Sequence, residues 1–192
     1  MRPDAEMRAY LENLFETNHG YCRGEWCRTR NEVLLGWVAG ERFNRVVELA
    51  GASGLFAGQF LDEHDEVSEY LHTDYINAAV ALALRRNKGR LAFRSVNRDA
   101  REPVSELAGA DLIVCTGCEH LPEGIEQRLF EQSRPGTVAL FGMSNFWVED
   151  GGHINICKSE AEARARIAPF GEVQEIELFR DLQWLVKAIR CS

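Results

Sequence analysis

The most constraining feature of this sequence is a regular alternation of short β-rich runs with helix-like segments, which begins near Arg45. Strands that alternate with helices imply a parallel, doubly wound sheet covered on both faces. The last two runs are separated only by a short polar turn, so we expect an antiparallel hairpin at the edge, because parallel neighbours need a long crossover. The expected strands are residues 45–49, 66–72, 90–96, 111–115, 137–143, 172–179 and 184–189, and the expected helices between them are residues 55–63, 77–86, 104–107, 123–132 and 160–167.

Two amphipathic segments precede this alternation. Residues 4–16 have apolar side chains at helical spacing, and residues 25–38 repeat the pattern. Residues 18–26, which join them, mix flexible, aromatic and charged residues, so we expect residues 17–30 to close over a bound ligand as a lid. We therefore predict a single α/β domain, with an N-terminal helical cap or lid over residues 1–40 and a ligand-binding core over residues 41–192.

Composition narrows the possible functions. A chain of 192 residues suits one α/β domain and can bury a core without disulfides or metal. The net charge of −8 argues against a broad nucleic-acid or membrane-surface footprint. The longest apolar stretch is too short to span a bilayer, and no signal peptide is evident. We expect a cytoplasmic protein that keeps its six cysteines as thiols.

A turn of small residues, Ala50–Gly54, joins the first expected strand to the helix that follows. In an open α/β sheet such a turn lies where the strand order reverses, and ligands bind there. Asp74 follows the second expected strand, where a carboxylate can accept hydrogen bonds from both ribose hydroxyls. Taken alone, the segment could be only a turn and Asp74 only a helix cap. Their spacing together favours a nucleoside ligand.

Residues 45–192 resemble the class I methyltransferases that use S-adenosylmethionine (SAM). The first motif of that family has the form Glu-x-Gly-x-Gly-x-Gly, and Glu48 and Gly54 match it, whereas Ala50 and Ala52 replace two glycines. The resemblance implies a Rossmann-like three-layer sandwich that binds SAM. Alanine disfavours positive φ, which predicts weaker SAM binding or a shifted pose.

Further motifs extend the resemblance along the core. Residues 95–100 are similar to the family segment that meets the adenine amine, with Asp99 as the better match and Asn97 as the alternative. Residues 119–122 read Glu-His-Leu-Pro, as in the family, and residues 144–154 are similar to its variable substrate loop. The resemblance implies that the cofactor is held by Glu48, Ala50, Gly51, Gly54, Asp74, Tyr75, Asn97, Asp99, Cys115 and Thr116.

Methyl transfer needs few catalytic groups, because positioning alone supplies roughly 7–11 kcal/mol in favourable cases. A hydroxyl or ammonium acceptor still needs a base of near-neutral pKa. His120 and His153 are the candidates, since both are expected at the carboxyl edge of the sheet; a purely structural hydrogen bond is the alternative for each. The expected contacts to the acceptor come from Tyr21, Trp26 and Asn145.

A metal site is a competing interpretation. Small-RNA 2′-O-methyltransferases use Glu-x-x-Glu-His with a distant histidine, but here Thr116 stands in place of the first glutamate. The remaining donors, Glu119, His120 and His153, lack a fourth, so we expect no metal. Cys115 and Cys118 also lack a second pair of ligands for zinc.

The sequence therefore predicts a SAM-dependent methyltransferase that modifies oxygen or nitrogen of a small or medium-sized acceptor. A catalytically silent methyltransferase-like binding module is the first alternative, and the two alanines of the turn motivate it. A metal-assisted RNA ribose methyltransferase is the second. Another adenine-nucleotide enzyme is disfavoured, because Gly-x-Gly-x-x-Gly is missing.

Overall fold

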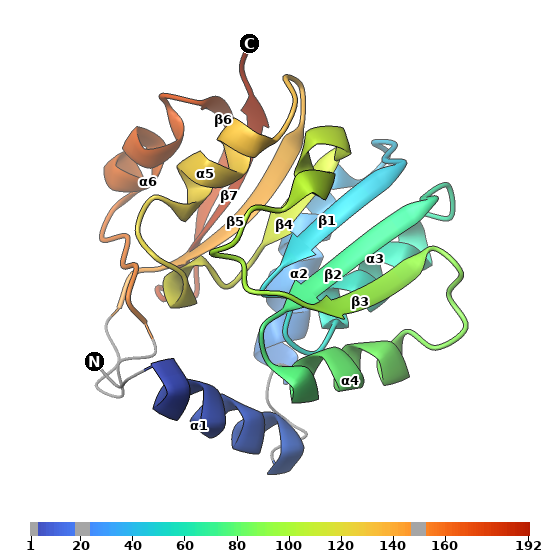
Figure 1. Cartoon of the computed structure of the whole chain (residues 1–192). Coiled ribbons are helices and arrows are strands. Elements are labelled where there is room, and N and C mark those ends of the chain that lie inside the picture. Colours follow the sequence, from blue (N-terminus) through green and yellow to red (C-terminus); the bar gives the residue numbers. More distant parts are fainter. Residues whose placement is uncertain (1–3, 18–23, 147–152) are drawn as a thin grey trace.

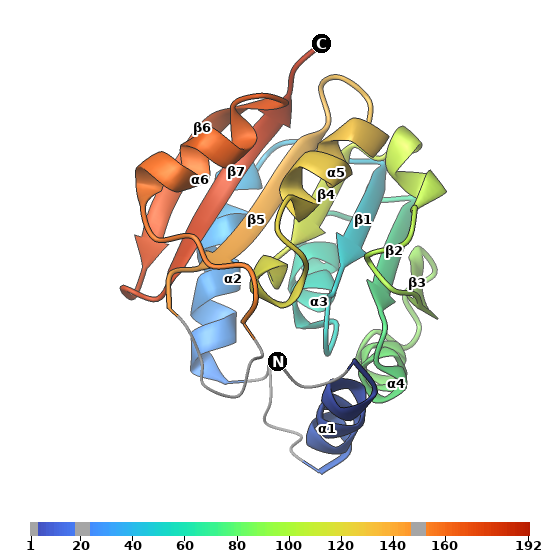
Figure 2. The same cartoon turned by 60° about the vertical axis from the view of Figure 1, so that its left-hand side comes forward.

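A seven-stranded sheet forms the centre of the molecule, and helices cover both of its faces (Figure 1 and Figure 2). The computed structural model describes residues 4–17, 24–146 and 153–192. The strands are β1 (Arg45–Leu49), β2 (Glu69–Asp74), β3 (Phe93–Asn97), β4 (Leu112–Cys115), β5 (Val138–Ser144), β6 (Gly171–Phe179) and β7 (Gln183–Arg190). The helices are α1 (Asp4–Thr17), α2 (Glu25–Val38), α3 (Leu55–Glu63), α4 (Asn77–Arg86), α5 (Ile125–Gln132) and α6 (Glu160–Ile167), with 3-10 helices η1 (Ser105–Gly109) and η2 (Cys118–His120).

The strand order is β3-β2-β1-β4-β5-β7-β6. Strands β1 to β5 are mutually parallel, and β7 pairs antiparallel with both β5 and β6. The expected doubly wound sheet with an antiparallel C-terminal hairpin is therefore confirmed. The chain runs outward from β1 through β2 to β3 and then returns to β4, which lies on the other side of β1. The strand order therefore reverses at β1.

Separate apolar clusters fill the spaces on the two faces of the sheet. One packs η1, α5 and α6 against residues such as Ile113 and Phe141, and the other packs α2 and α3 against residues such as Val114 and Leu140. Ile113 and Val114 are neighbours in β4 that point to opposite faces, and both are fully buried. This double burial explains why the parallel strands read as continuous apolar runs.

The two N-terminal helices have different surroundings. Helix α2 packs on the sheet face beside α3, whereas α1 lies beyond the carboxyl ends of the parallel strands, next to α4 (Figure 1). Phe15 packs with Ile76 and Leu82, and the Glu12 carboxylate accepts hydrogen bonds from the N–H groups of Asn77 and Ala78 at 2.9 Å each. Since α4 has no side-chain cap from its own N-cap residue, Glu12 supplies one from 65 residues away.

Several boundaries differ from the expected ones. Strand β2 begins at Glu69 rather than residue 66, because pairing with β1 starts where Glu69 stands opposite Arg45. The segment expected to be a helix over residues 104–107 is the 3-10 helix η1, closed by a Leu107 N–H to Val104 O bond. Helix α5 begins at Ile125 rather than residue 123, because Gly124 has a left-handed φ of 82°.

None of the helices in the described parts of the chain combines the length and apolar character that a membrane-spanning segment requires.

Candidate functional site

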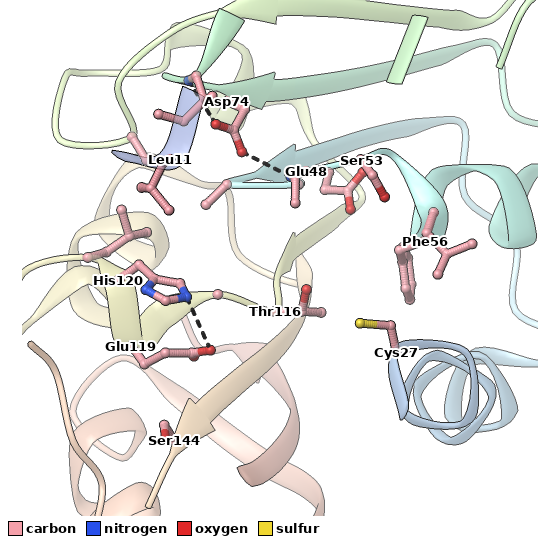
Figure 3. A pocket seen from close by; sticks show the side chains of 18 of the residues that line it. Leu11, Cys27, Glu48, Ser53, Phe56, Asp74, Thr116, Glu119, His120 and Ser144 are labelled. Carbon is pink, nitrogen blue, oxygen red and sulfur yellow. Dashed lines mark hydrogen bonds and ion pairs between the residues drawn. The ribbon is translucent and has the colours of Figure 1, made fainter. Parts of the chain in front are cut away.

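A cavity of about 330 Å³ opens at the carboxyl ends of the parallel strands, beside the point where the strand order reverses. Known small-molecule sites occupy about 300–1,000 Å³ and favour this place in open α/β sheets. Figure 3 shows Asp74 on one side of the cavity, and Glu119 and His120 on the other. The predicted site residues that line it are Trp26, Glu48, Ala50, Gly51, Asp74, Tyr75, Thr116, His120 and His153.

The turn after β1 has the left-handed backbone conformation that glycine favours. Ala50 and Ala52 have φ values of 51° and 50°, and Gly54 has 64°. Left-handed backbone costs an L-residue roughly 1–2 kcal/mol, so both alanines are strained. Hydrogen bonds from Gly51 N–H to Thr73 O at 3.1 Å and from Gly54 N–H to Gly51 O at 3.0 Å hold the turn. The alanines therefore do not prevent the left-handed turn from forming.

Asp74, the last residue of β2, is joined to this turn. Its Oδ2 accepts from Ala52 N–H and its Oδ1 from Ile76 N–H, both at 2.9 Å. Burial raises the pKa of this carboxyl to about 6, although the two N–H bonds oppose the shift. Asp74 therefore braces the loop before α4, whereas the N–H groups at the start of α4 are bonded by Glu12.

Gly51 lies against a buried polar pair under the turn. A Cβ on Gly51 would lie 2.5 Å from His72 Cδ2 and 2.7 Å from Glu48 Cδ, so the position is closed to a side chain. Glu48 Oε2 accepts from Tyr70 Oη at 3.0 Å, and burial raises the Glu48 pKa to about 8. Burial also lowers the His72 pKa to about 4. Tyr70 and His72 thus support the turn, although no sequence motif singled them out.

His120 and His153, the two candidate bases, lie next to each other in the lining of the cavity. The ring centroids of His120 and His153 are 5.0 Å apart, and His120 Nε2 lies 3.8 Å from Glu119 Oε1. His153 Nδ1 lies 3.2 Å from Phe146 O. A carbonyl oxygen only accepts, so this contact places the proton on Nδ1 and leaves the Nε2 lone pair of the neutral ring available.

The predicted adenine contacts do not line the cavity. Asn97 donates from Nδ2 to Asp74 O at 3.2 Å, and Asp99 forms an ion pair with Arg101 at 2.6 Å. Two neighbours of Asp99 in sequence, Arg98 and Ala100, line the cavity instead. The segment after β3 thus reaches the site through residues on either side of the predicted one.

Other predicted residues hold the surrounding structure. Gly54 is the N-cap of α3, and Cys115 is fully buried in the core. Asn145 donates from Nδ2 to Asp181 O at 2.9 Å and does not line the cavity. Tyr21, with residues 18–23 of the predicted lid, lies outside the described residues. Trp26, on the first turn of α2, does line the cavity and contacts Phe179 edge-on.

Arg30 and Gln183 are two polar residues of the cavity that were not among the predicted site residues. Arg30 of α2 stacks over the Trp26 ring at 5.3 Å and donates from Nη2 to Asn31 Oδ1 at 2.9 Å, and its charge acts on Glu48. Gln183, at the start of β7, is 129 residues from the end of the first motif at Gly54 and is buried beside Glu119. No local pattern identifies either, because each reaches the site through packing between distant elements.

Comparisons with known proteins rest on structure alone, because the sequence matches no protein-family model and no curated protein. The N-methyltransferase NodS from Bradyrhizobium japonicum WM9, in complex with S-adenosyl-L-homocysteine (SAH), superposes with a TM-score of 0.76 at 16% identity, covering 96% of this chain and 98% of that one. The chain has the class I SAM-dependent methyltransferase fold.

Other methyltransferases share this fold with the chain. Magnesium protoporphyrin IX methyltransferase from Synechocystis PCC 6803, with bound SAM, gives a TM-score of 0.71 at 11% identity, over 95% of this chain and 96% of that one. A putative methyltransferase from Haloferax volcanii, in complex with the Trm112 activator, gives 0.75 at 14% identity, over 94% and 97%. These low identities establish the methyltransferase fold, and the acceptor has to be argued from the site.

Proposed function

We propose that this protein is a SAM-dependent methyltransferase acting on oxygen or nitrogen of a small or medium-sized acceptor. The observation that carries the proposal is that one cavity contains both Asp74 with its left-handed turn and the pair His120 and His153. The first group suits a nucleoside, and the second suits proton removal from an acceptor.

The residues on the β1–β2 side fit SAM. The Asp74 carboxylate has lone pairs beyond those used by Ala52 and Ile76, and these would accept from ribose hydroxyls. Arg30 provides a cation near Glu48 that would pair with the ligand's carboxylate. The sulfonium of SAM supplies the methyl group to be transferred by an in-line displacement. The chain's own task is then to hold both reactants and exclude water.

The residues on the β4–β5 side fit the acceptor. His153 is fixed by Phe146 O with its Nε2 lone pair available, so it is the proposed base, and His120 packs edge-on against it. Trp26, Phe146 and Leu182 line the same cavity and provide an apolar wall for the body of the acceptor. A small-molecule acceptor therefore fits this side better than a polymer of phosphates.

A silent binding module is the second candidate, and the strain at Ala50 and Ala52 favours it. Isothermal titration calorimetry with SAH separates the two proposals. Saturable 1:1 binding supports the methyltransferase, and His153→Ala should then leave SAH binding intact while abolishing turnover of an acceptor. Absence of SAH binding at millimolar ligand supports the silent module.

A further inference from the structure

The corner of the cavity formed by Glu119, His153 and Gln183, here called the Glu119 corner, is rich in hydrogen-bond acceptors. The Glu119 side chain is only 10% exposed, and its nearest basic partner within 4.0 Å is His120. Among the described residues, no lysine or arginine forms an ion pair with it. A buried carboxylate of this kind is stabilised by a bound cation or a strong donor.

Gln183 holds the Glu119 carboxylate through its amide nitrogen, and the orientation of this amide is fixed. Its Nε2 donates to Thr116 O at 3.0 Å and lies 3.3 Å from Glu119 Oε2, so exchanging the amide nitrogen and oxygen would bring oxygens together. The residue is 2% exposed, and Oε1 is buried with no hydrogen-bond partner in the described structure. Gly142 makes room for this amide, since a Cβ there would lie 2.7 Å from Nε2.

The spacing of Glu119 and His120 lies between the values expected for ligands of a zinc ion and for acceptors around an ammonium group, so it admits both. One ligand atom from each of Glu119, His120 and His153 lies within 4.8 Å of the others, and the Glu119–His120 pair is 3.8 Å apart. Acceptors bonded to a tetrahedral nitrogen stand about 4.4–5.2 Å apart, for N–H···O distances of roughly 2.7–3.2 Å. Ligands of a tetrahedral zinc stand only about 3.3–3.6 Å apart.

We propose that the acceptor is an aliphatic amine, bound through its ammonium group to the Glu119 carboxylate, which Gln183 Nε2 holds in place. This inference rests on the proposed methyltransferase function. The ammonium gives one proton to His153 Nε2, and the freed lone pair forms the new N–C bond to the methyl group, while the C–S electron pair stays on sulfur. The methylammonium product keeps the other two N–H protons, and Trp26 and Phe146 pack against the hydrocarbon part of the amine.

Matched amines and alcohols test the proposal by binding alone. Dissociation constants of benzylamine and benzyl alcohol, and of hexylamine and hexanol, are measured by NMR on the SAH-bound protein. We expect each amine to bind at least ten-fold more tightly than its alcohol. Glu119→Gln should abolish that preference, whereas Glu123→Gln, an exposed neighbour, should keep it. Gln183→Met removes the Nε2 donor that holds Glu119, at similar volume, and should also reduce the preference, which covers the case in which Glu119→Gln does not fold.

Two results would overturn the amine proposal. One is equal binding of amine and alcohol in both pairs by protein that binds SAH. The other is micromolar binding of Zn²⁺ or Mn²⁺ that disappears in His153→Ala, which would make the Glu119 corner a metal site. Failure of SAH itself to bind would instead refute the methyltransferase function, so the two failures are distinguishable. Mass spectrometry of benzylamine incubated with deuteromethyl-SAM should then find a singly methylated amine.

Discussion

The Asp74 carboxylate accepts a hydrogen bond from the Ala52 N–H at 2.9 Å, which ties the end of β2 to the strained turn after β1. The acid that the sequence associates with ribose thus also holds the turn that would approach the rest of the ligand. Ala52 needs this support because its φ of 50° is unfavourable for alanine. Cofactor affinity and the conformation of the turn should therefore depend on one another.

Gly51→Ala should destabilise the fold by about 1–3 kcal/mol, as overpacking does. The added methyl would lie 2.5 Å from His72 and 2.7 Å from Glu48, and both side chains are buried. Urea unfolding measures the change. Gly36→Ala is the matched control, because a Cβ there meets nothing within 4 Å. Equal stability of the two variants would contradict the close contact of Gly51 with the side chains of Glu48 and His72.

Ala52→Gly should leave the protein as stable as it is or slightly more so. Relief of the left-handed strain, roughly 1 kcal/mol, offsets the greater freedom of glycine in the unfolded chain. Ala81→Gly, at an exposed position inside α4, is the control and should cost about 1 kcal/mol. If Ala52→Gly costs as much as Ala81→Gly in chemical denaturation, Ala52 is not strained.

Glu48 should make stability fall as pH rises. Its folded pKa of about 8 lies above the ordinary value of 4.5, so its contribution is complete below pH 4.5 and is lost as pH rises through 8. The contribution of Asp74, whose pKa rises from 3.8 to about 6, is also lost as pH rises, but over a lower range that ends near pH 6. Between pH 6 and pH 8, Glu48→Gln should therefore reduce the fall in unfolding free energy by about 1–3 kcal/mol. Parallel profiles for the two proteins would contradict the buried, protonated Glu48.

Glu12→Ala should loosen α1, because Glu12 bonds the first two N–H groups of α4. A lost helix cap costs about 0.5–2 kcal/mol. Leu11 and Phe15 of α1 line the cavity, so SAH should also dissociate faster if α1 acts as part of the predicted lid. Hydrogen exchange over residues 4–17 is the measurement, with exposed Glu16→Ala as the control. Unchanged exchange in Glu12→Ala would refute the docking role of this carboxylate.

Local patterns were sufficient to predict the order of the elements and the edge of the sheet that carries the site. Strand–helix alternation fixes a parallel sheet, and the Ala50–Gly54 turn marks its ligand edge. His120 and His153 could be placed at that edge because each follows a strand, and the structure brings their rings within 5.0 Å. The paired Asp99 and the buried Cys115 show that a motif match does not determine which side chain reaches the cavity.

The rest depends on contacts between distant segments. Gln183 reaches Glu119 only because β7 inserts beside β5, where Gly142 leaves space for the amide. The Glu12 cap spans 65 residues, and nothing in the sequence of α1 distinguishes that glutamate from Glu16. Such pairings are set by tertiary packing, which periodicity and spacing do not report.

Titration calorimetry of the wild-type protein and Asp74→Ala with SAH tests the central claim most directly. A carboxylate that hydrogen-bonds the ribose contributes about 1.5–3 kcal/mol, so Asp74→Ala should bind SAH roughly 10- to 150-fold more weakly. Asp99→Ala, outside the cavity lining, should bind SAH as the wild type does. Saturable binding by the wild type with this loss in Asp74→Ala is the predicted result. Wild-type protein that does not bind SAH, or a folded Asp74→Ala variant with unchanged affinity, would contradict the account.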